Sequence, residues 1–115
     1  MSVKIYHNPR CSKSRQTLQL IREQGIEPEI IEYLKTPPTE AELSDILDKL
    51  DMQPRDLMRK KEKEYKQTGM DDESLNRDAL IKGMVNTPKL IERPIVLVND
   101  KATVGRPPEN VLAIL

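Results

Sequence analysis

The sequence predicts an α/β fold with a mixed sheet, in a single domain over residues 1–115. The N-terminal part follows the order strand, helix, strand, which implies a parallel pair joined by a right-handed crossover. Helical patterns come next, and the chain ends with two strand patterns and a short helix, which implies an antiparallel hairpin with a covering helix. A chain of 115 residues can bury one core, and this core must be aliphatic because the sequence has no Phe, no Trp and three Tyr.

The first two predicted strands flank a helix. Val3 and Ile5 occupy alternate positions, which is typical of a short strand. Residues 12–25 carry apolar side chains at helical spacing, and Gly25 is a suitable helix stop. Residues 27–34 are rich in β-forming residues. Together these segments form the predicted β-α-β unit.

The middle of the chain predicts three helices. Thr39 is a plausible N-cap with Glu42 three residues later, which is the pattern of a capping box. Residues 53–70 predict a short charged helix, and residues 74–88 predict another helix. The side chains expected to face inward from these helices are Leu43, Ile46, Leu47, Leu50, Leu57, Met58, Leu80, Ile81, Met84 and Val85.

The C-terminal part predicts a hairpin and a last helix. Residues 93–99 contain a continuous apolar run, which is typical of a central strand, and Asn99-Asp100 predicts the hairpin turn. The last helix is expected to carry apolar residues at Val111, Leu112 and Leu115. This order of elements indicates a thioredoxin-like (glutaredoxin-like) mixed sheet with a helical insertion after the second strand. In such folds a cis-proline usually lies before the central strand, so we expect a cis Arg93–Pro94 bond.

Composition and charge exclude several classes of protein. Lys+Arg and Asp+Glu both number 19, so nothing favours bulk attraction to nucleic acid. No apolar run approaches the ~18 residues of a membrane span, and the N-terminal residues become polar too early for a signal peptide. One cysteine forms no internal disulfide, and one His with one Cys falls short of a zinc site. We expect a cytoplasmic monomer without metal or bound cofactor.

The stretch YHNPRCSKSR concentrates the chemistry of the sequence, because it holds the single cysteine and the single histidine. Cys11 falls where a strand loop gives way to a helix, and unpaired N–H groups at a helix start favour an anion and lower a cysteine pKa. Arg15, at i+4, projects over the same helix face, and His7 can stabilise a thiolate by charge or by hydrogen bond. The alternative is a buried, inert cysteine beside surface charges.

Ser14 occupies the position of the second cysteine in a Cys-x-x-Cys redox motif. A site with one thiol can attack a substrate, but it cannot resolve its own adduct. We therefore expect that a second thiol comes from outside the chain.

The segment around Cys11 resembles the active-site pattern H-N-P-x-C-x-x-S-R of the glutaredoxin-dependent, ArsC-like arsenate reductases. The resemblance continues through TPP, RDLMRKKE, NTPKLIERPIV and GRPPENVLAIL, in order and over essentially the whole chain. It is closest to the short bacterial arsenate reductase-like proteins. The better-studied arsenate reductases carry Gly-Thr where this chain has Ser12-Lys13.

The resemblance implies reduction of arsenate to arsenite through a covalent thioarsenate, with glutathione as co-substrate and glutaredoxin as electron donor. The family's catalytic residues match Cys11 as nucleophile, His7, Ser14 and Arg15. The arginines of the family's anion pocket match Arg59, Arg93 and Arg106.

The arginines also make physical sense as oxyanion ligands, because guanidinium groups give paired, charge-assisted hydrogen bonds. Arg93 precedes a buried strand, and Arg106 ends the adjacent one, so the two are expected to lie close together. Arg59 lies in RKKEKE, which is also typical of a solvated helix face.

Two other functions remain open at this stage. One is a glutathione-dependent thiol reductase that does not act on arsenate. The other is a redox-sensing module that binds the transcription machinery, although such regulators generally carry Cys-x-x-Cys and this chain has Ser14.

Overall fold

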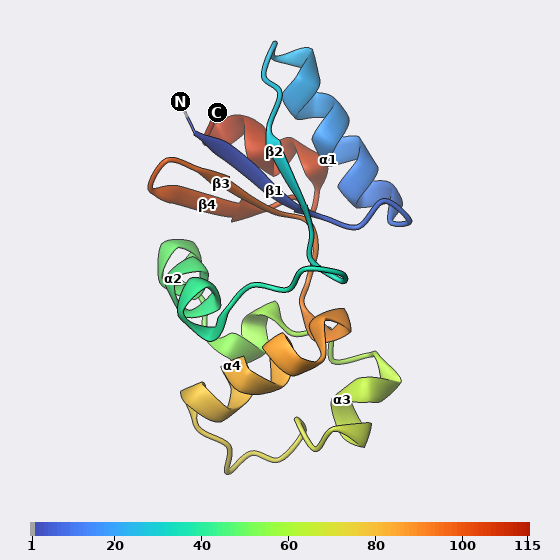
Figure 1. The fold of residues 1–115 in the computed structure, drawn as a ribbon, viewed down its shortest axis with the longest axis vertical. Helices are drawn as coiled ribbons and strands as arrows, with labels where there is room; N and C mark the ends of the chain where they lie inside the picture. Colours follow the sequence, from blue (N-terminus) through green and yellow to red (C-terminus); the bar gives the residue numbers. More distant parts are fainter. Residues whose placement is uncertain (1) are drawn as a thin grey trace. The chain divides into compact units, whose positions relative to one another are not determined.

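A four-stranded mixed sheet forms the centre of the first of two compact units. Its strands are β1 (Val3–His7), β2 (Glu29–Glu32), β3 (Ile95–Val98) and β4 (Lys101–Val104), in the order β2-β1-β3-β4. β1 runs parallel to β2, whereas β1 with β3 and β3 with β4 are antiparallel. The predicted mixed sheet and the central position of the apolar run are therefore confirmed (Figure 1).

The computed structural model describes residues 2–115. The first unit comprises the chain up to Thr36 together with Arg93–Leu115, and the second is the segment Pro37–Glu92. The second unit is continuous in sequence and follows β2, as expected of a helical insertion. The expectation of a single domain stays a prediction.

The core of the first unit lies on one face of its sheet. Helix α1 (Ser12–Glu23) and the 3-10 segment Pro108–Ala113 both contribute to it. Its buried side chains are Val3, Ile5, Leu18, Ile21, Val96, Val98 and Val111. The alternating apolar side chains of β1 and the helically spaced ones of α1 therefore pack in the same core. Leu112, one of the apolar residues expected in the last helix, is 43% exposed because a tight 3-10 turn directs it outward.

The second unit contains helices α2 (Glu40–Leu50), α3 (Lys63–Gln67) and α4 (Arg77–Asn86). Thr39 caps α2 in the predicted capping box: its hydroxyl accepts from the Glu42 N–H at 3.1 Å, and the Glu42 carboxylate accepts from the Thr39 N–H at 2.9 Å. Leu50 and Val85, both predicted to be buried, are only partly buried at the edges of their helices.

The predicted helix over residues 53–70 was wrong as a continuous element. The chain instead forms a 3-10 turn at Pro54–Leu57, a β-bridge from Met58 to Ile91, and the five-residue helix α3. The charged residues between these pieces offer no apolar stripe that would favour one long helix. Leu57 and Met58 are nevertheless buried, as predicted.

Two local features complete the fold. The Arg93–Pro94 bond is cis, as predicted, and the Arg106–Pro107 bond is cis in addition.

Within residues 2–115, none of the helices has the length and apolar character needed to cross a bilayer.

Candidate active site

Cys11 is the N-cap residue of α1, at the end of the short loop that follows β1. Its backbone N–H donates to the Asn8 carbonyl at 3.0 Å, and its carbonyl accepts from the Arg15 N–H at 3.0 Å. The residue is buried, with 8% of its surface exposed. The predicted position at a helix start is confirmed.

The environment of Cys11 favours the thiolate. Burial acts to raise the pKa of the Cys11 thiol. The backbone N–H of Ser14, the charge of Arg93, the backbone N–H of Lys13 and a hydrogen bond from Arg93 act in the opposite direction and together bring the pKa below its ordinary value. The predicted lowering is thus confirmed, and it favours a reactive thiolate over an inert, buried thiol.

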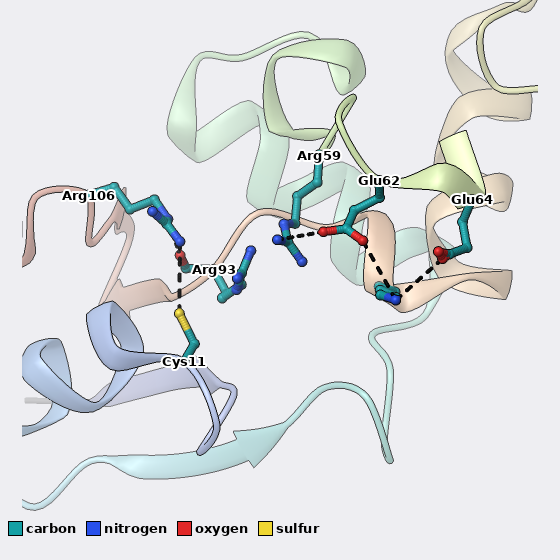
Figure 2. A network of polar contacts seen from close by, with 7 residues as sticks. Cys11, Arg59, Glu62, Glu64, Arg93 and Arg106 are labelled. Atoms are coloured by element: carbon teal, nitrogen blue, oxygen red, sulfur yellow. Dashed lines mark hydrogen bonds and ion pairs between the residues drawn. The ribbon is translucent and has the colours of Figure 1, made fainter. Parts of the chain in front are cut away.

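Two arginines from the C-terminal part of the chain lie beside Cys11 (Figure 2). The Arg106 Nη2 atom is 3.8 Å from the Cys11 sulfur, and Arg106 Nε donates to the Arg93 carbonyl at 3.0 Å. The predicted proximity of Arg93 and Arg106 is confirmed. Their guanidinium groups give the sulfur a cationic surrounding in which a tetrahedral oxyanion can be held by several donors.

Gly105 allows the segment that carries Arg106 to approach α1 closely. Its N–H donates to the Pro94 carbonyl at 2.9 Å. A Cβ atom at this position would lie 2.5 Å from Thr17 Oγ1 and 2.9 Å from Pro94 Cγ. The absence of a side chain at Gly105 is therefore a condition for this packing, which the sequence analysis did not anticipate.

His7 lies against Ser14, and no hydrogen bond joins it to Cys11 among the described residues. His7 Nδ1 and Ser14 Oγ are 2.6 Å apart, and both residues are buried. Burial lowers the pKa of His7, and the nearby Glu32 only partly counteracts this effect. Burial therefore favours the neutral imidazole, and the expected stabilisation of the thiolate by His7, through charge or a hydrogen bond, stays a prediction.

Arg15 supports the loop rather than the sulfur. Its Nη1 donates to the Pro9 carbonyl at 3.0 Å, and its side chain is exposed. This hydrogen bond joins the first turn of α1 to the segment that precedes Cys11.

Arg59 belongs to the second unit and is engaged there in a chain of ion pairs (Figure 2). Its Nη2 atom lies 2.7 Å from Glu62 Oε1, and the other Glu62 oxygen lies 3.6 Å from Lys89 Nζ. Lys89 also lies 3.5 Å from Glu64 Oε2. The i,i+3 spacing of Arg59 and Glu62 in the sequence is a signal from which this pairing could have been predicted.

No group of three His, Cys, Asp or Glu side chains within residues 2–115 is arranged to hold a metal ion. The groups that the structure brings together at Cys11 are its thiol, the N–H groups at the start of α1, and arginine side chains.

Comparison with known proteins identifies the family. The model of the ArsC family matches residues 6–114, a range that includes all seven candidate residues. This chain belongs to the ArsC family. Its α/β, thioredoxin-like fold is the fold of its structural neighbours in that family.

Individual relatives are similar to nearly the whole chain. The YfgD protein of Escherichia coli (strain K12), whose name states no activity, is 58% identical over 98% of this chain and 96% of its own length. The arsenate reductase of Neisseria meningitidis (serogroup A) is 52% identical over 98% of this chain and 97% of its own. The solved structure of an arsenate reductase from Vibrio cholerae superposes with a TM-score of 0.97 at 52% identity, covering 100% of this chain and 98% of that one.

Proposed function

We propose that this ArsC-family protein reduces arsenate to arsenite through a covalent adduct on Cys11. The observation that carries the proposal is the Cys11 thiol of lowered pKa with Arg93 and Arg106 beside its sulfur. A thiolate is the required nucleophile, and guanidinium groups are suitable ligands for a tetrahedral oxyanion. The names of relatives more than 50% identical support arsenate as the substrate.

The first step joins sulfur to arsenic. The Cys11 thiolate attacks the arsenic of arsenate, a sulfur–arsenic bond forms, and one oxygen leaves as water after taking up protons. The arginines hold the remaining oxygens and neutralise the developing negative charge. We assign this part to Arg93 and Arg106 from their contacts, and to Arg59 from the family resemblance.

The second step transfers two electrons to arsenic. A glutathione thiolate forms a disulfide with Cys11, the sulfur–arsenic bond breaks, and its electron pair leaves with arsenic, which becomes arsenic(III). A thiol of glutaredoxin then displaces Cys11 from the mixed disulfide and regenerates the thiolate. An external thiol is required because the chain has one cysteine. Use of the glutathione pool implies that the protein works in the cytoplasm, where we expect it to act as a monomer.

A glutathione-dependent thiol reductase is the second candidate. The lowered pKa of Cys11 and the Cys-x-x-Ser spacing are sufficient for such an activity without any oxyanion. Arginines beside the sulfur favour arsenate reduction, because attack on a glutathione disulfide does not require a site for a tetrahedral anion.

A coupled assay distinguishes the two. Oxidation of NADPH is followed with glutathione reductase, glutathione, glutaredoxin and arsenate, and the wild type is compared with Cys11→Ser. Turnover that requires both arsenate and Cys11 supports arsenate reduction. Activity toward glutathionylated substrates without activity toward arsenate supports the thiol reductase. Arsenate turnover that persists in Cys11→Ser would rule out the covalent scheme.

A further inference from the structure

The hydrogen bonds of Ser14 determine the state of His7. Ser14 is fully buried (0% exposed). Its hydroxyl oxygen accepts from the Asn8 N–H at 3.0 Å and lies 2.6 Å from His7 Nδ1. A hydroxyl group has one hydrogen to donate and two positions at which it accepts. The direction of the bond to His7 therefore depends on where the hydroxyl hydrogen can go.

Among the described residues, His7 Nδ1 is the one acceptor available to that hydrogen. If Nδ1 carried a proton, two N–H groups would point at the Ser14 oxygen and the buried hydroxyl hydrogen would have no acceptor. Leaving a buried donor without a partner is unfavourable. Every hydrogen of this group has an acceptor when the Ser14 hydroxyl donates to an unprotonated Nδ1. The proton of the neutral imidazole is then on Nε2.

The charges around His7 agree with a neutral ring. Glu32, which pairs with His7 across the parallel strands β1 and β2, acts to raise the His7 pKa. Arg22 and Arg15 on α1 act to lower it, and burial has the largest effect, also lowering it. The one nearby carboxylate is thus outweighed, and the ring can act on its surroundings as a hydrogen-bonding group without a charge.

Ser14 connects this ring to the thiol. Its side chain is held by the end of β1, through His7, and by the loop, through Asn8. Its backbone N–H donates toward the Cys11 sulfur and contributes to lowering the Cys11 pKa. Fixing the Ser14 side chain therefore fixes the N–H group that faces the thiolate.

We propose that His7 serves Cys11 as a neutral positioning residue, whose Nδ1 accepts the Ser14 hydroxyl and so holds the first turn of α1 against the sulfur. This inference deepens the proposed function and depends on it only for Cys11 as the nucleophile. It assigns His7 to the geometry of the turn, whereas a charged histidine would act directly on the thiolate.

The test measures the Cys11 pKa from the pH dependence of its alkylation by iodoacetamide, without arsenate. His7→Ala and Ser14→Ala should each raise this pKa by roughly half to one unit, the size expected from weakening one hydrogen bond to a charged group. His7→Asn should retain the wild-type value, because its side-chain carbonyl can accept the Ser14 hydroxyl and it takes up no proton. Ser12→Ala, which removes an exposed hydroxyl from the same turn, is the matched control and should change nothing.

The double variant His7→Ala/Ser14→Ala decides between the two modes of action. If His7 acts through Ser14, the double variant has the same pKa as Ser14→Ala alone. Additive shifts, or a pKa in His7→Asn as high as in His7→Ala, would overturn the proposal. A failure of arsenate turnover in the wild type would leave these outcomes unaffected.

Nuclear magnetic resonance of the wild-type protein tests the same idea without substitution, should the buried variants not fold. Long-range ¹H–¹⁵N spectra report which ring nitrogen carries the proton. We expect Nε2 protonated and Nδ1 bare at pH 7. A doubly protonated ring, or a proton on Nδ1, would contradict the proposal.

Discussion

Replacement of Arg93 by methionine removes the side chain that acts on the Cys11 thiolate by both charge and hydrogen bond. A hydrogen bond to a charged group contributes about 1.5–3 kcal/mol. Since one pKa unit corresponds to about 1.36 kcal/mol, Arg93→Met should raise the Cys11 pKa by about one to two units. We expect the lower end of this range, because Arg106 Nη2 remains 3.8 Å from the sulfur in the absence of Arg93.

The assay is the rate of Cys11 alkylation as a function of pH. Below both pKa values, a rise of one unit reduces the thiolate fraction tenfold, and the higher nucleophilicity of the more basic thiolate offsets part of this loss. Arg22→Met is the matched control: it removes an arginine that pairs with Glu27 at 2.9 Å and does not contribute to the Cys11 pKa. Far-ultraviolet circular dichroism checks that both variants are folded.

The reasoning would be refuted by a folded Arg93→Met protein with an unchanged Cys11 pKa. That result would mean that the helix N–H groups alone are sufficient to stabilise the thiolate. A rise in Arg22→Met as large as in Arg93→Met would mean instead that net charge, and not the local contact, sets the pKa.

Three further predictions concern pH, packing and the ion pairs. Because folding lowers the His7 pKa below 6.5, the unfolded chain binds more protons under mildly acidic conditions. The corresponding stability is fully present above pH 6.5 and is lost as the pH falls below it, so urea midpoints should decline there in the wild type and decline less in His7→Asn. Gly105→Ala should lower thermal stability by about 1–3 kcal/mol, because its Cβ would lie 2.5 Å from Thr17 Oγ1; an unchanged melting temperature would argue against this packing. If Arg59 binds the oxyanion, Glu62→Gln should lower the KM for arsenate several-fold with little change in kcat, because Arg59 then no longer neutralises a carboxylate 2.7 Å away; an unchanged KM in steady-state assays would separate Arg59 from substrate binding.

Local patterns account for the parts of the fold that were predicted correctly. The alternation at Val3 and Ile5 and the capping box at Thr39 are properties of neighbouring residues, so they are visible in the sequence. The prediction of one helix over residues 53–70 was wrong because charged residues have good helix propensity but supply no apolar side chains for tertiary packing. The last helix is a 3-10 segment, which changes which residues share a face and leaves Leu112 exposed.

The candidate site was predictable in its position and less so in its partners. A cysteine at a helix start implies a stabilised thiolate from local geometry alone, and the structure bears this out. The partner of His7 was not predictable, because side-chain hydrogen bonds depend on the relative placement of β1 and α1. The same holds for the packing of Gly105 against Thr17, which joins segments far apart in the sequence.

The two groups of contacts that stabilise the thiolate differ in what they require of the fold. The N–H groups of Lys13 and Ser14 need only the first turn of α1, which a few residues can form. The contact between Arg106 and Cys11 joins residues 95 positions apart, so it exists only after β3 has paired with β1 and β4 with β3. Full activation of the thiol is thus coupled to completion of the sheet, and an incompletely folded chain exposes a cysteine of more ordinary reactivity. The thiolate is therefore most reactive in the folded state, in which the arginines are also in place to bind an oxyanion.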